Sequence, residues 1–201
     1  MGRWVRLVET ALLLLLSAAA GWAQSPNAAV PAESQAVTIA KGCATSRYFN
    51  FSLRLPQGMQ AQPLPSTAAS APGAAILFIA YRERGVHRDV TIATADDVSG
   101  EKDKSAARWM DKLREANGKR EGVVEQGEIE PLDVKGQKFS SLTFQEVRED
   151  GSVVNEAVYA TALRGKIVSF TFGSADAPEL DELERSMQTF SPSAAGCSAG
   201  K

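Results

Sequence analysis

The sequence contains a single histidine, His87, in a chain of 201 residues. A Ser-His-Asp or Cys-His catalytic arrangement would have to use that residue, which lies in the charged segment 82–89. Neither G-x-S-x-G nor H-E-x-x-H occurs, and the scattered glycines form no phosphate cradle between a strand and a helix. We therefore interpret His87 as a solvated turn residue, and we predict no catalytic, cofactor-binding or metal-ligating residue.

Positive charge is also scarce. The 22 Lys and Arg residues are outnumbered by 24 Asp and Glu residues, which gives a net charge of −2. General nucleic-acid binding needs a basic surface, and the sequence has no basic run, so nucleic acid is not an expected partner. The expected partner is therefore a protein or a small molecule of unknown identity.

Apolar runs long enough to span a membrane are absent, and the run near the start lies at residues 11–16. Two arginines precede this run and small residues follow it, with the best cleavage site after Ala23 and an alternative after Ala20. The run is too short for a permanent transmembrane helix. We predict a signal peptide over 1–23, a flexible linker over 24–41, and a secreted or periplasmic mature chain without a transmembrane segment.

Cysteine is nearly absent as well, and its two copies, Cys43 and Cys197, bracket almost all of the mature chain. In an exported protein an even pair predicts a disulfide, which would tether the tail 193–201 to the start of a single domain over 42–192. The loop-entropy model gives roughly 5 kcal/mol of stabilisation for so long a loop, as an upper figure. The alternative is two free thiols on flexible ends.

What the sequence does contain is a stretch, 123–173, that predicts a four-strand antiparallel meander. Three dipeptides with glycine second, at 135–136, 150–151 and 164–165, fit two-residue hairpin turns. If each turn sets the register, Phe144 lies opposite Ala157. Side chains alternate along a strand, so one face is predicted to collect seven residues: Ile129, Leu142, Phe144, Ala157, Tyr159, Phe170 and Phe172.

Three further strands are expected upstream, at 48–56, 75–81 and 89–94, from their apolar content and alternation. The segment 57–74 between the first two is rich in Pro, Ala and Ser. Such a long loop is either a functional lid or a disordered insert.

Amphipathic spacing predicts one helix over 102–117, with Trp109 in its core-facing side, and a second that opens at Asp176 and ends at Phe190. An Asp N-cap, an early Pro and Glu179 favour that start. The predicted fold is α+β, with an antiparallel sheet of about seven strands ending in the four-strand meander. Two main helices would pack on this sheet as an α/β/α sandwich.

The carboxylate pairs have plain structural interpretations with one exception. Glu128 and Glu130 fit an exposed strand face, and four acids fit the first turns of the last helix, where the helix dipole favours negative charge: Glu179, Asp181, Glu182 and Glu184. Asp96 and Asp97 are the pair predicted in a loop, and a calcium-ligand or acid/base role is the alternative interpretation for them. Asn50 begins a glycosylation sequon inside a predicted strand.

The order of these elements resembles the Mog1/PsbP-like fold. The resemblance rests on the Y-F-x-F-S-x-x-x-P strand at 48–56, the helix with Trp109, the G-x-x-F strand at 136–139 and the M-x-T-F ending at 187–190. Known members are non-enzymatic, including photosystem accessory subunits, a GTPase-binding factor and many exported bacterial proteins. The resemblance implies a fold and no particular binding residue.

Three functions follow from these observations. The first is an exported, non-catalytic binding or accessory module of unknown ligand. The alternatives are a carboxylate-based hydrolase with a site near the loop 57–74, and an envelope module that binds other proteins through an exposed strand edge.

Overall fold

The computed structural model describes residues 37–62, 74–85 and 87–197. The predicted signal peptide, residues 24–36 of the predicted linker, residues 63–73 of the long loop and residues 198–201 lie outside this part. The strands are β1 (Val37–Ala40), β2 (Cys43–Ser46), β3 (Phe51–Arg54), β4 (Gln60–Gln62), β5 (Ala74–Arg84), β6 (His87–Asp97), β7 (Val123–Gln126), β8 (Glu130–Val134), β9 (Gln137–Val147), β10 (Val153–Leu163) and β11 (Lys166–Ser174). The helices are α2 (Ala106–Asn117), α3 (Ala177–Arg185) and the 3-10 turn η2 (Ser186–Thr189).

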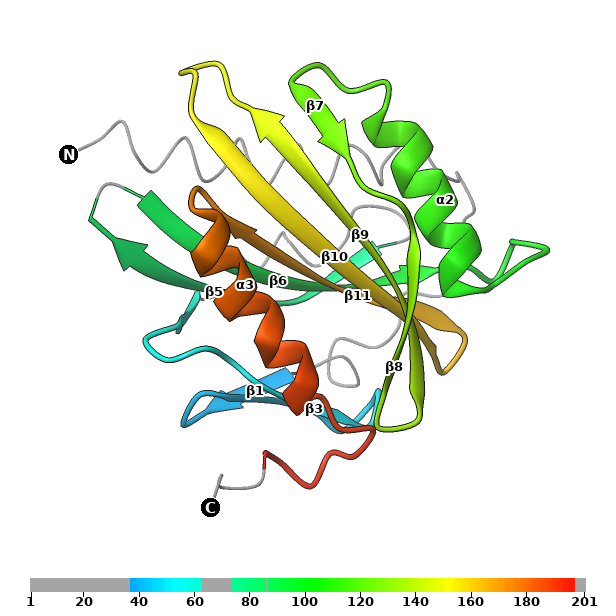
Figure 1. Cartoon of the computed structure of the whole chain (residues 1–201). Coiled ribbons are helices and arrows are strands. Elements are labelled where there is room, and N and C mark those ends of the chain that lie inside the picture. The colour runs from blue at the N-terminus through cyan, green and yellow to red at the C-terminus, as the bar shows by residue number, and fades with distance from the viewer. Residues whose placement is uncertain (1–36, 63–73, 86, 198–201) are drawn as a thin grey trace.

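The strands form two antiparallel sheets (Figure 1). The small sheet has the order β1-β2-β3, and the main sheet has the order β4-β5-β6-β11-β10-β9-β7, with β8 also paired to β9. The α+β class with a mostly antiparallel sheet and two helices is therefore confirmed. Within the described residues the main sheet has eight strands, where about seven were predicted, and β1 lies inside the predicted linker.

Two of the three predicted hairpin registers are correct. Leu163 pairs with Lys166, which places Tyr159 opposite Phe170, and Val134 pairs with Gln137 across the turn at 135–136. Positive φ angles at Gly136 and Gly165 permit these tight turns.

The β9–β10 register differs from the prediction by one residue. Val147 pairs with Val153, and Phe144 lies opposite Glu156 rather than Ala157. The connection is a five-residue loop in which Arg148 N–H donates to Ser152 O at 2.9 Å. A slip of one residue moves side chains to the other face, so the predicted seven-residue face is wrong: Ile129, Leu142 and Phe144 lie on the side opposite Phe170 and Phe172.

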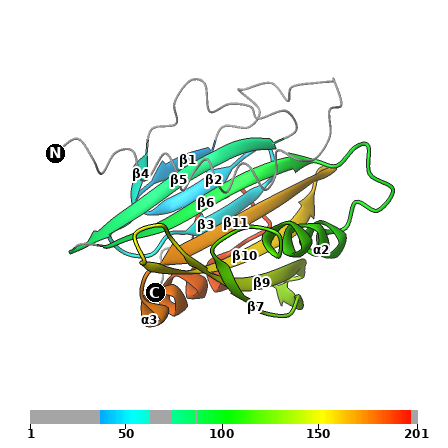
Figure 2. The same ribbon diagram turned by 90° about the horizontal axis from the view of Figure 1, so that it is seen from above.

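The main sheet consequently has an apolar cluster on each face. Leu180, Leu183 and the η2 residue Met187 pack on the face that carries Phe170, together with residues of the small sheet. On the other face α2 inserts Met110, and Trp109 packs at the margin as a partly buried core residue. Figure 2 shows α2 lying against β9 and β10, the strands with which it makes most of its contacts.

Both helices are shorter than predicted. α2 begins at Ala106, where the hydroxyl of Ser105 accepts from the backbone N–H of Arg108 at 3.2 Å, and so caps the helix. α3 begins after Asp176 with a proline in its first turn, as predicted, but the Asp176 side chain makes no capping bond. None of the helices in the described ranges is long and apolar enough to cross a membrane.

Candidate functional site

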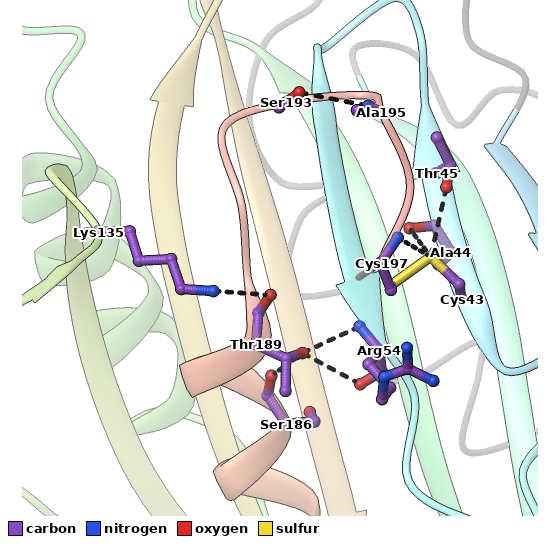
Figure 3. Close-up of a disulfide and its surroundings, with 10 residues drawn as sticks. All are labelled: Cys43, Ala44, Thr45, Arg54, Lys135, Ser186, Thr189, Ser193, Ala195 and Cys197. Carbon is purple, nitrogen blue, oxygen red and sulfur yellow. Dashed lines mark hydrogen bonds between the residues drawn. A yellow bond between two sulfur atoms is a disulfide. The ribbon is translucent and has the colours of Figure 1, made fainter. Parts of the chain in front are cut away.

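The predicted disulfide is present between Cys43, the first residue of β2, and Cys197, with a Cα–Cα distance of 5.8 Å. Figure 3 shows the C-terminal tail lying beside β2 and β3, where Cys197 N–H contacts Cys43 Sγ at 2.9 Å. The disulfide joins segments 154 positions apart, so it closes most of the described chain into one loop. The tail is therefore covalently fixed to the small sheet.

Hydrogen bonds hold the same tail. Ser52 and Ser191 exchange two backbone hydrogen bonds, at 3.0 and 2.9 Å. Asn50 Nδ2 donates to the carbonyl of Pro192 at 3.0 Å, and Asn50 Oδ1 accepts from Ala194 N–H at 3.2 Å. The amide nitrogen that a glycan would occupy is thus engaged in binding the tail.

The residues considered for chemistry in the sequence do not come together. His87 is exposed at the start of β6, opposite Arg84. Asp96 and Asp97 are the last residues of β6, not loop residues, so their side chains point to opposite faces of the strand. The expectation of a paired loop carboxylate is therefore wrong, and no group of three or more His, Cys, Asp or Glu within the described ranges could hold a metal ion.

Asp96 and Asp97 have different environments. Asp97 accepts a hydrogen bond from Lys166 Nζ at 2.7 Å, and this bond, with those from Ser99, outweighs partial burial and lowers the pKa of Asp97. Asp96 is buried, and burial raises its pKa to about 7 against the weaker effect of a hydrogen bond from Thr94. Asp96 is therefore a buried acid at the end of a strand, near the start of β5 at Ala74.

The acids of α3 form specific contacts that the sequence interpretation missed. Glu179 and Glu182 bind the guanidinium of Arg82, at 2.9 and 3.0 Å. Arg82 also binds Asp89 Oδ2 through Nε at 2.9 Å, and Asp89 Oδ1 accepts from the Ser174 hydroxyl at 2.8 Å. We call Arg82, Asp89, Glu179 and Glu182 the Arg82 cluster; it ties α3 to β5 and β6.

The Arg82 cluster is largely buried at its centre, since the side chains of Arg82 and Asp89 are 8% and 2% exposed. Burial alone would lower the pKa of Arg82, but its hydrogen bonds with Glu182 and Asp89 raise the pKa overall. The hydrogen bond from Arg82 lowers the pKa of Glu182. Side chains alternate along β5, so Arg82 shares a buried face with Ala80. Extending the predicted strand 75–81 by one residue would have revealed the burial of Arg82.

A second buried acid, Glu156, lies on the α2 face of β10. Its Oε2 has no hydrogen-bond partner, and burial together with the nearby Glu146 raises its pKa to about 7. Arg120 binds Glu146 at 2.6 Å and lies over the ring of Phe144, the cross-strand neighbour of Glu156. Glu156 is thus a carboxyl group enclosed beside an existing ion pair.

Glu156 and Asp96 are far apart on the same sheet face. Glu156 lies opposite Gly173 of β11, whereas Asp96 lies opposite Ile167 of the same strand. Six residues along a strand correspond to roughly 20 Å. Paired carboxylates in glycoside hydrolysis stand about 5–10 Å apart, so these two acids do not form such a pair.

Part of the opposite sheet face is not covered by α3. α3 packs on β11, β10 and β6, while Thr143 and Val147 of β9 stay exposed. We call this surface the β9 strip: Ser141, Thr143, Gln145, Val147, Val153 and Asn155. Within the described residues all four exposed large hydrophobic side chains lie on β7 to β10: Val124, Leu132, Val147 and Val153.

The strip is organised by cross-strand pairs. Val147 lies directly opposite Val153, and the two are 36% and 40% exposed. Gln145 Nε2 donates to Asn155 Oδ1 at 2.7 Å, and Asn155 in turn contacts the carbonyl of Ser174. These bonds fix the two amide side chains, so the strip presents a preformed surface of hydroxyl, amide and valine groups.

No protein-family model matches the sequence, and none of the curated proteins matches it. Solved structures do. The chain is similar to the solution structure of cyanobacterial PsbP (CyanoP) from Synechocystis sp. PCC 6803, with 15% identity, a TM-score of 0.47, and coverage of 84% of this chain and 98% of that one.

Two further structures are similar. One is LpqN, involved in cell envelope biogenesis of Mycobacterium tuberculosis, with 14% identity, a TM-score of 0.46 and coverage of 68% and 76%. The other is a protein of unknown function, PA94, from Pseudomonas aeruginosa, with 19% identity, a TM-score of 0.44 and coverage of 69% and 88%. The neighbours thus include a PsbP protein, as the sequence resemblance implied, and at these identities the likeness concerns the fold alone.

Proposed function

We propose that this protein is an exported, non-catalytic binding or accessory module that engages a partner through the β9 strip. Export is supported by the predicted signal peptide and by the Cys43–Cys197 disulfide, because disulfides persist mainly in oxidising compartments. The observation that carries the proposal is the distribution of polar groups. The acids with raised pKa are buried and far apart, while the β9 strip presents exposed Thr143, Val147 and Val153 beside amide side chains that are fixed by hydrogen bonds.

The hydrolase alternative has less support. Asp96 and Glu156 are too far apart to act as a general acid and base on one bond. Arg82 and its carboxylates are bound to one another between α3 and the sheet, where they fix the helix. A hydrolase would need residues from the loop 57–74, of which 63–73 lie outside the described part.

Binding through an added strand is also less favoured. The edge formed by β7 and β8 contains a bulge near Val123 and Glu125, and β8 carries Glu130, Pro131 and Asp133. Proline, charge and bulges are the features that discourage edge-to-edge pairing. The partner is therefore proposed to lie on the sheet face rather than along its edge.

Site-specific photocrosslinking of the mature chain tests this proposal. The photoreactive p-benzoylphenylalanine replaces Thr143 on the strip, and in a control chain it replaces the exposed Lys104 before α2. In the exported fraction we expect a discrete adduct from position 143 and none from position 104. Equal labelling from both positions, or turnover of a substrate that disappears in Asp96→Asn or Glu156→Gln, would count against a non-catalytic module.

A further inference from the structure

The charges around the β9 strip restrict what it can bind. Glu130 lies opposite Ser141 and Glu125 lies opposite Gln145, so both carboxylates border the strip from the β7–β8 edge. Directly opposed residues share a sheet face. Both glutamates are exposed.

The α3 side of the strip is acidic too. The hydroxyl of Tyr159, whose cross-strand neighbour is Ser141, donates to Glu184 Oε1. Asp181 is exposed and precedes Glu184 by three positions, so the two carboxylates lie on the same flank of α3. Burial, the hydrogen bond to Glu184, and then the charges of Glu184 and Glu130 raise the pKa of the Tyr159 phenol, so acids from both borders act at one point.

The α3 border also carries one cation, because Arg185 is exposed four positions after Asp181. The hairpin at the valine end carries Arg148 beside Glu149 and Asp150, a mixture of signs. Acidic side chains thus border both sides of a narrow strip of uncharged side chains. This arrangement favours a partner segment whose positively charged side chains flank apolar or hydroxyl-bearing ones.

We propose that the β9 strip receives an extended, basic segment of another protein, whose Lys or Arg side chains reach Glu125, Glu130, Asp181 and Glu184. The inference rests on the proposed function and adds the chemistry of the partner. From Ser141 to Val147 the strip runs for six residue steps, roughly 20 Å. That length fits about six extended residues. Alternate apolar side chains would face the strip and meet Val147 and Val153, while the long stems of the intervening Lys or Arg side chains bend back to the border carboxylates.

The test uses the disulfide-bonded mature chain and a fluorescein-labelled Lys-Val-Lys-Val-Lys-Val peptide, followed by anisotropy. We expect saturable binding that weakens as salt is raised, and no binding of the matching Glu-Val peptide. Glu130→Lys should weaken binding by roughly tenfold, the effect of about 1.4 kcal/mol. The control Glu128→Lys makes the same charge change, but Glu128 binds Arg114 of α2 at 2.9 Å, so it should change the affinity by less than about twofold.

Several results would overturn the basic-segment proposal. They are the absence of binding, equal loss in Glu130→Lys and Glu128→Lys, or equal binding of the acidic peptide. Sedimentation that shows a dimer abolished by Thr143→Arg would make a second copy of this chain the occupant. If position 143 still crosslinks to a partner in a salt-insensitive way, the proposed binding module stands and only the basic partner is wrong. If neither the crosslink nor peptide binding is seen, both proposals fail.

Discussion

Phe144 and Phe170 lie two strands apart and pack on opposite faces of the main sheet. Phe170 contacts the rings of Phe51 and Phe190, with centroids 5.4 and 5.9 Å away. Phe144 belongs instead to the cluster that contains Met110 of α2. The sheet therefore separates two apolar cores, one that contains Phe170 and one that contains Phe144.

The first prediction concerns the independence of these cores. Phe144→Leu and Phe170→Leu should each lower the free energy of unfolding by about 1–2 kcal/mol. Because the sites are on opposite faces and roughly 14 Å apart, the double variant should lose the sum within about 0.5 kcal/mol. Urea unfolding of the four proteins measures this, and a coupling above about 1 kcal/mol would show that the cores are not separate.

The second prediction concerns the Arg82 cluster. Arg82→Met should lower the free energy of unfolding by about 3–5 kcal/mol, because it removes the buried cation that binds Asp89 and leaves only Arg84, whose Nε lies 3.8 Å from Asp89 Oδ2. Arg84→Met is the matched control: the Arg84 side chain is 45% exposed and binds the same two α3 glutamates. An exposed pair contributes less than about 1 kcal/mol, so similar losses in the two variants would contradict the assigned role.

The third prediction follows from Glu156. Its folded-state pKa of about 7 lies above the ordinary value of 4.5, so the folded state holds the proton over this interval while the unfolded state releases it. The contribution of Glu156 to stability is complete below its ordinary pKa of 4.5. About 3 kcal/mol of it is lost as pH rises through the folded-state pKa of about 7. Glu156→Gln should therefore be more stable than the parent protein at pH 8.

The measurement is urea unfolding at pH 5 and pH 8. The parent protein should lose stability between these values, and Glu156→Gln should lose about 3 kcal/mol less. Asp96, whose pKa is also raised to about 7, continues to contribute in that variant, and adding Asp96→Asn should remove its share. A pH profile unchanged by Glu156→Gln would mean that Glu156 does not hold its proton in the folded state.

The fourth prediction concerns Gly122, where β7 is about to begin. A Cβ there would stand 2.6 Å from the carbonyl oxygen of Val147, and φ is +91°. Gly122→Ala should cost about 3 kcal/mol of stability. Gly151→Ala has a similar φ of +80° but open space around the added methyl, so it should cost only about 1 kcal/mol; equal costs would argue against the close approach at Gly122.

The sequence was sufficient to predict the class of fold, both helices and the disulfide. It also predicted the registers at 135–136 and 164–165, where glycine follows a residue that itself has positive φ, Lys135 or Arg164. That backbone pattern is the two-residue turn with the twist of an antiparallel hairpin.

The register at 150–151 could not be obtained in the same way. Gly151 also has a positive φ, of 80°, but an Asp-Gly pair fits longer loops as well as two-residue turns. Hydrophobic alternation did not decide between them, because β10 carries apolar residues on both of its faces. Ala157 and Tyr159 lie on one face and Val158 and Ala160 on the other, so either face could have met Leu142 and Phe144.

The Arg82 cluster and the β9 strip escaped prediction for a different reason. Glu179 and Glu182 are ordinary acids of the first two helical turns in sequence, and only the packing of α3 on β11, β10 and β6 brings them within 3.0 Å of Arg82. The strip depends on where α3 stops covering the sheet, which side-chain spacing alone does not encode. Contacts between elements distant in sequence therefore account for most of what was missed.

The bond between Cys43 and Cys197 makes the polypeptide between them a covalent ring. One protease cut anywhere inside that ring leaves a single molecule of unchanged mass, apart from one added water. Nicked protein would migrate as an intact chain on a non-reducing gel and fall into two fragments only after reduction. A protein built in this way can survive a first proteolytic event without losing either piece.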